Sequence, residues 1–313
     1  MTDSDSAWID LPNEGVLAVR GADARKFLNG QLSQQLLTLG PTETTLAGLH
    51  NPQGRTIALL RVIADGPEDL LCLLPRSLLE GVLALLRKYL LRSKVVLSDE
   101  TPLWRVQGRW PSASAAAETA GPEFATTEAA PPLSWPHTRD GRWMRLVRGD
   151  APPADDVVAG RGPARVAARE ADIAAWHRAD IAAGLPRIHP ATQGEFVAQM
   201  LNLDVLEGIS FNKGCYTGQE VIARAHFRGR VKRRLQRFAA PVTMLDPGAR
   251  ITLADGREAV VVDSAAAHEG HVEFLAVTRY PTAVSDESIA QNAAAPRLAT
   301  TPLSLPYELP AAE

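Results

Sequence analysis

The stretch TLAGLHNPQGRTIALLRVIA, residues 45–64, contains two β-rich runs separated by a short turn-forming segment. TLAGLH (45–50) and RTIALLRVIA (55–64) carry the apolar and β-branched side chains typical of strands, and NPQG (51–54) supplies the asparagine, proline and glycine that favour a turn. The pattern predicts a β-hairpin. DLLCLLP (69–75) follows it as a further strand candidate.

The segments around this hairpin predict a first α+β unit. GVLAVR (15–20) is typical of a strand that leads into a helical pattern. After the DLLCLLP strand, the segment LLEGVLALLRKYLLR (78–92) has the amphipathic pattern of a helix that covers a sheet. Because Ser77 stands three residues before Glu80, the pair predicts a capping box at the start of that helix.

Weaker signals predict a second unit of the same kind. RWMRLVRGDA (142–151) echoes GVLAVRGADA (15–24), which indicates a strand-to-helix unit used twice. READIAAWHRADIAAGLP (169–186) predicts a helix that Gly184 ends as a C-terminal cap. The Ala-, Thr-, Pro- and Glu-rich tract 111–132, which precedes both segments, predicts a linker or a weak helix.

Beyond Val231 the pattern changes to short β-rich runs such as RITLA, EAVVVDS and VEFLAVTR, separated by DPG, ADG and HEGH turns. This alternation predicts an all-β C-terminal domain. The chain has 313 residues, which is long for a single core, so two or three domains are expected.

The composition, net charge and absence of several motifs disfavour some classes of protein. Charged residues make up 22% of the chain, and the formal net charge of -3 favours neither nucleic acid nor membrane binding overall. The acidic N-terminus lacks the basic start of a secretory signal, and Glu80, Arg87 and Lys88 interrupt the most apolar window. No nucleophile elbow, Walker-type or H-E-x-x-H motif is present. A cytoplasmic protein is therefore expected.

The two cysteines are too few for a disulfide scaffold or a self-contained four-thiolate metal site. Cys72 lies inside an apolar strand pattern and is expected to fill the core. Cys215 lies in KGCYTGQE (213–220), just before the helical run QEVIARAHF (219–227), where the helix N-terminus and Lys213 favour the thiolate. This placement predicts a nucleophile, a redox centre or a metal ligand. The alternative is a small buried side chain in a glycine-containing turn.

Two further features leave alternatives open. Trp176, on the expected helix, either packs in the core or stacks on a flat ligand ring. The window 221–245 has no acidic residue, which predicts a surface for nucleic-acid phosphates, the glutamate tail of a cofactor or an acidic partner, or else a solvated face. Its basic residues include Arg224, Arg228, Arg230, Lys232, Arg233, Arg234 and Arg237.

KGCYTGQE together with the following VIARAHFRG (221–229) resembles the signature of the YgfZ family. Members of this family are folate-binding proteins that support iron–sulfur enzymes, and they are related to the aminomethyltransferase of the glycine cleavage system. The resemblance covers nearly the whole chain and is faintest over 111–165. It includes GADARKFLNGQL (21–32), NPQG, WHRADIAAGLPRIHP (176–190), GISFNKGCY (208–216) and LSLPYEL (303–309).

The resemblance implies an α+β fold in a ring-like, three-part arrangement. Residues 1–235 would form an aminomethyltransferase-like, folate-binding region of two ferredoxin-like units, and residues 236–313 would form a C-terminal all-β barrel. Trp176 would line the pterin pocket. A family position that is often aromatic falls at Glu14 in this chain, where nearby Trp8 is a candidate substitute.

The resemblance also implies a function. The chain would bind tetrahydrofolate or a derivative, and would help to assemble, repair or maintain iron–sulfur clusters in client enzymes, including those that modify tRNA. Cys215 would be the functional thiol, and no resident metal is expected. Lys213 would favour its thiolate, and the residues that shape and position the loop would be Gly214, Tyr216, Gly218, Gln219, Glu220 and Arg224.

One departure from the related enzymes bears on catalysis. Aminomethyltransferases follow their N-x-x-G turn with an acidic pair that serves the folate and the methylamine group, whereas this chain has Ala58 and Leu59. Glycine cleavage activity is therefore not expected. The sequence does not decide whether the protein catalyses another reaction. The alternatives are a folate-dependent one-carbon transferase and an RNA-binding accessory protein. Contact with nucleic acid would be indirect, and no membrane partner is expected.

Overall fold

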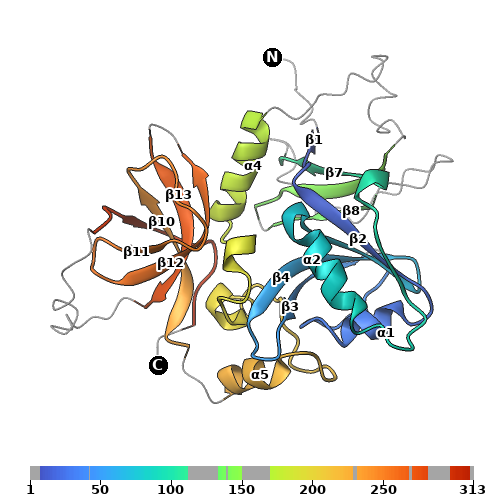
Figure 1. The fold of residues 1–313 in the computed structure, drawn as a ribbon. Helices are drawn as coiled ribbons and strands as arrows, with labels where there is room; N and C mark the ends of the chain where they lie inside the picture. The colour runs from blue at the N-terminus through green and yellow to red at the C-terminus, as the bar shows by residue number, and fades with distance from the viewer. Residues whose placement is uncertain are drawn as a thin grey trace, which may run out of the picture.

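Three antiparallel sheets form the frame of the molecule (Figure 1). The computed structural model describes residues 8–41, 43–111, 133–138, 140–149, 170–227, 231–267, 270–280 and 297–310. Few helices accompany the sheets, so the α+β expectation is confirmed in this coarse form. The ferredoxin-like units and the ring-like arrangement stay predictions.

The first sheet contains the hairpin predicted at residues 45–64. Its strand order is β3-β4-β5-β2-β6, with β2 at Glu14–Arg20, β3 at Thr44–His50, β4 at Thr56–Asp65, β5 at Asp69–Pro75 and β6 at Val96–Asp99. Thr44 of β3 lies opposite Ile63 of β4, and the NPQG turn joins the two strands. The predicted hairpin and the DLLCLLP strand are therefore confirmed.

Both faces of this sheet are buried, which explains why its strands are almost continuously apolar. In β2, Leu17 and Val19 belong to the core shared with helices α1 (Ala24–Asn29) and α2 (Arg76–Arg87). The alternate residues Val16 and Ala18 belong to a second core, shared with the next sheet. Successive side chains of a strand point to opposite faces, so one strand contributes to both cores.

The predicted capping box at the start of α2 is wrong. The helix begins at Arg76, directly after β5, with Pro75 as its N-cap and no side-chain cap hydrogen bond. Ser77 is therefore already inside the first turn, where its hydroxyl cannot cap the helix. The strand ends at Pro75 as predicted, and the helix follows it without a separate capping residue.

The second sheet has the order β1-β7-β9-β8. Its strands are β1 (Ile9–Asp10), β7 (Trp104–Arg109), β8 (Leu133–Pro136) and β9 (Trp143–Arg148), and the short helix η1 (Thr101–Leu103) precedes β7. The strand half of the predicted repeat is confirmed as β9. The helix expected after it, and the tract 112–132, lie outside the described residues.

Helix α4 (Glu170–Ala182) links the second sheet to the third (Figure 1). It ends close to Gly184, whose φ of 68° confirms the predicted C-terminal cap region. The chain then passes through η3 (Pro190–Thr192), η4 (Ala198–Leu201) and α5 (Gln219–Phe227), which confirms the helix predicted after Cys215.

The third sheet confirms the all-β character of the C-terminal part. Its order is β11-β12-β13-β10-β14, with β10 at Arg233–Ala240, β11 at Arg250–Thr252, β12 at Glu258–Ala266, β13 at Val272–Arg279 and β14 at Thr301–Leu303. Phe238 and Phe274 stack inside it with ring centroids 5.6 Å apart. Closure into a barrel and the domain boundary at residue 235 stay predictions.

A buried carboxylate joins the third sheet to α4 and to the segment after it. Asp263 of β12 accepts hydrogen bonds from His177 Nε2 at 2.7 Å and from His189 Nε2 at 2.8 Å. Burial by itself raises the pKa of Asp263, but the two histidine hydrogen bonds lower it to about 2. Burial by itself lowers the pKa of His177, and the bond to Asp263 and its charge raise it above its ordinary value.

This cluster makes the free energy of unfolding depend on pH. Because folding raises the pKa of His177, the contribution of this histidine to the free energy of unfolding is complete below about pH 6.5. It is lost as the pH rises through the pKa of the folded state.

We expect Asp263→Asn to lower the free energy of unfolding by about 2–4 kcal/mol at pH 6, and by less at pH 9. Urea unfolding at both pH values measures this. Asp255→Asn, which breaks a more exposed pair with Arg257, is the control. An equal loss at both pH values would show that the pair carries no proton-linked charge.

Candidate functional site

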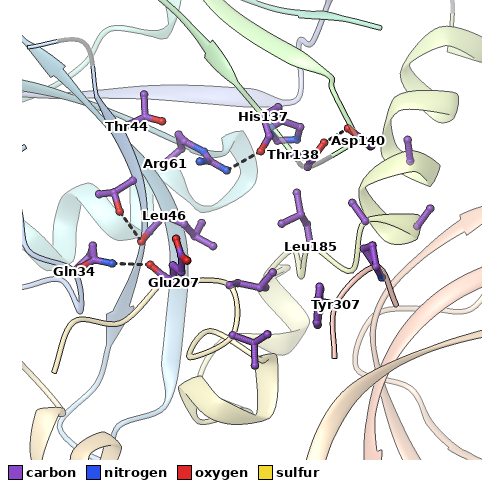
Figure 2. A pocket seen from close by; sticks show the side chains of 17 residues that line it. Gln34, Thr44, Leu46, Arg61, His137, Thr138, Asp140, Leu185, Glu207 and Tyr307 are labelled. Carbon is purple, nitrogen blue, oxygen red and sulfur yellow. Dashed lines mark hydrogen bonds between the residues drawn. The ribbon is translucent and has the colours of Figure 1, made fainter. Parts of the chain in front are cut away.

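A cavity of about 580 Å³ lies where distant parts of the chain meet (Figure 2). Its walls come from β3 and β4, the β8–β9 turn, the C-terminal half of α4, the segment 205–207 and the C-terminal segment 306–307. This volume is within the range of pockets that hold small organic ligands. The site thus depends on segments from each end of the chain.

One wall of the cavity is apolar and smooth. Ala179, Ala182 and Ala183 lie three and four residues apart, and therefore share one face of the helical segment that lines the cavity. Leu46 and Leu185 extend this wall. Small side chains leave room beside the helix, so the wall suits the flat face of a ring.

The opposite side of the cavity carries polar and charged groups. Gln34, Thr44 and Thr45 offer amide and hydroxyl groups, and Arg61 reaches from β4 toward the β8–β9 turn (Figure 2). Arg61 Nη2 donates to the His137 carbonyl oxygen at 3.4 Å. Burial lowers the pKa of Arg61 to about 10.

Asp180, which follows Ala179 on α4, binds charged groups of the β8–β9 turn. Its carboxylate accepts from His137 Nε2 at 3.0 Å and from Arg142 Nη1 at 2.8 Å. Burial by itself raises the pKa of Asp180, but the charges and hydrogen bonds of His137 and Arg142 hold it below its ordinary value. Arg142 also pairs with Asp140 at 2.8 Å. No local sequence pattern indicates this network, because its partners come from separate segments.

Trp176 is buried one turn before the alanine wall. The Arg142 guanidinium lies 4.6 Å from its ring centroid, and His137 stacks on the ring at 5.4 Å. Trp110 meets it edge-on at 5.5 Å. His137 lines the cavity and Trp176 does not, so the indole supports the cavity wall from behind. Glu14, which pairs with Arg187, and Trp8, which packs against Arg145, do not line the cavity either.

The Cys215 loop is held to the end of α1 and the segment after it by a buried lysine. Lys213 Nζ donates to the carbonyl oxygens of Asn29 and Leu32 at 2.6 Å and of Gln34 at 2.8 Å. Burial lowers the pKa of Lys213 to about 8. Its Nζ also lies 4.9 Å from the ring centroid of Tyr216. These contacts show that Lys213 anchors the loop.

The rest of the motif docks on the NPQG turn. Gly218 has φ of 82°, and a Cβ placed there would lie 2.5 Å from the Asn51 carbonyl oxygen. A Cβ on Gly54 would lie 2.9 Å from Val221 Cβ on α5. Gln219 Oε1 accepts from the Tyr216 backbone N–H at 3.2 Å and closes the turn before the helix. Glycines at both positions thus permit the close approach of two segments far apart in sequence.

Cys215 itself is exposed, and its thiol makes no side-chain hydrogen bond with any residue in the described part of the chain. Gly214, Glu220 and Arg224 are exposed around it. Cys72 is buried in the first core, where burial raises the pKa of its thiol, which confirms its expected core position. Of the two cysteines, only Cys215 is therefore open to a reaction partner.

A hydrogen-bonded path joins the thiol loop to the cavity. The backbone carbonyl of Gln34 accepts from Lys213, and the Gln34 side-chain Nε2 donates to the Glu207 carbonyl oxygen at 2.6 Å. Gln34 and Glu207 both line the cavity, whereas Cys215 does not. The thiol loop is thus connected to the cavity wall through Gln34.

The predicted basic surface after residue 221 is wrong in part. Arg234 pairs with Asp204 at 2.6 Å, and Arg237 pairs with Glu273, so acids from other segments neutralise both. Arg228 and Arg230 lie outside the described residues. Among the described ranges, no group of three His, Cys, Asp or Glu side chains is placed to hold a metal ion, and no helix is long and apolar enough to cross a membrane.

Comparisons with known proteins agree with this architecture. No protein-family model matches the chain. Relatives named tRNA-modifying protein YgfZ from Enterobacter sp. and Klebsiella pneumoniae are 34% and 36% identical over 236 and 233 residues, which cover 72% of this chain and 70% and 69% of the relatives. A crystal structure of glycine cleavage system aminomethyltransferase T from Bartonella henselae matches 87% of this chain and 78% of its own with a TM-score of 0.62 at 13% identity, a likeness of fold alone. The chain belongs to the YgfZ family.

Proposed function

We propose that this protein binds tetrahydrofolate or a derivative in the cavity and uses Cys215 to help assemble, repair or maintain iron–sulfur clusters in client enzymes. The observation that carries the proposal is the pairing of a ligand-sized cavity with an exposed thiol, joined through Lys213 and Gln34. Because the relatives are named as tRNA-modifying proteins, the proposed clients include tRNA-modifying enzymes. We place this activity in the cytoplasm.

The cavity has chemistry suited to a folate. The alanine wall can cover a flat ring, and Gln34, Thr44 and Thr45 can bond its polar edge. In this proposal Trp176 serves the folate site by holding His137 in the wall. The region 1–235 would contribute the folate site as two ferredoxin-like units, and 236–313 would close it as a barrel in a ring-like arrangement.

The proposed thiol chemistry needs a partner. Cys72 is buried, so Cys215 is the only cysteine able to touch a cluster at the surface. One thiolate cannot hold a stable iron–sulfur cluster, whose irons need several ligands. Cys215 would therefore contact a cluster transiently, with the client supplying the other ligands, or undergo thiol exchange with the client.

The experiment is complementation of cells that lack this protein, with iron–sulfur enzyme activity as the readout. We expect Cys215→Ser to lose the activity while the purified variant keeps the wild-type melting temperature, because the exposed thiol contributes little to packing. Cys72→Ala, which removes the other thiol, is expected to keep the activity. Full activity with Cys215→Ser would overturn the thiol role. Saturable tetrahydrofolate binding in calorimetry is required for the folate part.

One-carbon transfer is the second candidate, because the fold resembles an aminomethyltransferase. Ala58 and Leu59 are buried in β4 and supply no carboxylate for this reaction. Transfer from a methylamine-type donor to tetrahydrofolate, measured with purified protein, would favour this candidate. The RNA-binding alternative is weakened, because Arg234 and Arg237 are already paired with acids.

A further inference from the structure

Arg61 is a cation in the cavity wall for which the described part of the chain supplies no paired counterion. It stands in the apolar strand β4, and its side chain points toward the adjacent His137 of the β8–β9 turn (Figure 2). Its one hydrogen bond to a described residue is the 3.4 Å contact with the His137 carbonyl oxygen. No carboxylate among the described residues forms an ion pair with it.

The described acids near the cavity do not form an ion pair with Arg61. Asp180 is bonded to His137 and Arg142, and acts on Arg61 only through its charge. Asp140 pairs with Arg142, and Glu207 lines the cavity as an exposed residue without an ion pair to Arg61. A half-buried guanidinium that lacks a paired anion is costly, since burial disfavours the charged form.

We propose that Arg61 receives a carboxylate of the cavity's ligand, whose ring lies along the alanine wall. A planar guanidinium suits a carboxylate because its fork can donate two parallel N–H bonds. The inference deepens the proposed function: for tetrahydrofolate, it places the acidic aminobenzoyl-glutamate end of the ligand at β4, with the pterin toward the rest of the cavity.

Three probes separate the inference from the proposed function in calorimetry on the full chain. 4-Aminobenzoyl-glutamate carries the acid without the pterin, tetrahydropterin carries the pterin without the acid, and tetrahydrofolate carries both. The variants are Arg61→Gln, Arg61→Lys, which keeps the charge without the fork, and Arg87→Gln, which removes an exposed arginine from α2 as the matched control. Thermal unfolding checks that each variant is folded.

We expect 4-aminobenzoyl-glutamate to bind wild-type protein and Arg87→Gln alike, and to bind Arg61→Gln at least about tenfold more weakly. Arg61→Lys should be intermediate, and tetrahydropterin affinity should not change. If Arg61→Gln does not fold, the loss in Arg61→Lys decides. The inference is overturned if 4-aminobenzoyl-glutamate does not bind, or if no Arg61 variant weakens its binding. It is also overturned if the Arg61 variants weaken only the binding of tetrahydropterin.

The two proposals fail in different ways. If tetrahydrofolate does not bind but 4-aminobenzoyl-glutamate binds through Arg61, the cavity recognises another aromatic acid and the proposed folate function is wrong. If tetrahydrofolate binds equally well to wild-type protein and Arg61→Gln, the folate function holds and the role of Arg61 is wrong.

Discussion

Lys213→Met is expected to lower the free energy of unfolding by about 3 kcal/mol. The methionine side chain has a similar length but no donor, so three carbonyl oxygens, those of Asn29, Leu32 and Gln34, lose the ammonium group that bonds them. Lys213 is also largely buried, and water cannot fully replace it as a donor. Urea unfolding followed by circular dichroism measures the loss.

The same substitution should loosen the thiol loop before the whole protein unfolds. We expect faster amide hydrogen exchange in the segments 29–34 and 213–216, because Lys213 is the side chain that ties them together. Lys88→Met, which removes an exposed lysine after α2, is the control and should change stability by less than about 0.5 kcal/mol. Equal stabilities for the two variants would show that the three carbonyl bonds add nothing to folding.

Gly218→Ala should cost at least about 2 kcal/mol, for a reason that concerns the backbone. Gly218 has φ of 82°, and an added Cβ would lie 2.5 Å from the Asn51 carbonyl oxygen and 3.0 Å from Gly54 Cα. That carbonyl already accepts from the Gly54 N–H at 2.9 Å, so a shift would also strain the hairpin turn. A lower melting temperature in thermal unfolding is the expected readout.

Gly214→Ala is the matched control within the same motif. No atom lies within 4 Å of a Cβ at this position, and its φ is not in the left-handed region. We therefore expect a change in the free energy of unfolding within about 0.5 kcal/mol. If both alanine variants melt at the wild-type temperature, the close contact between α5 and the NPQG turn does not stabilise the protein.

Local patterns predicted the elements well where a single segment carries the signal. The hairpin at 45–64 follows from β-rich runs around NPQG, and α5 follows from the helical run after Cys215. The capping box at Ser77 failed because the helix starts at Arg76, directly after the predicted strand, so that Ser77 lies inside the first turn. Element type thus follows from neighbouring residues, whereas the exact end of a helix can differ by a residue or two from the local signal.

For the site residues too, the local sequence gave one part of the information and contacts between distant segments gave the other. The sequence marked Cys215 and Lys213 through their motif, but it did not indicate that Lys213 bonds carbonyls of the segment 29–34. Arg61 was visible only as one base in an apolar strand, and its place in the cavity depends on His137 and the alanines of α4. Likewise, Arg234 looked free because its partner Asp204 lies outside the acid-free window.

By itself, the sequence determined most strands and helices, the family resemblance and the position of the candidate thiol Cys215, because these depend on residue order and local chemistry. The tertiary structure decided which charges are paired, which cysteine is exposed, and where a ligand-sized cavity lies. The physical reason is that burial and ion pairing depend on contacts between segments up to 184 residues apart, as between Lys213 and Asn29. No local pattern carries that information.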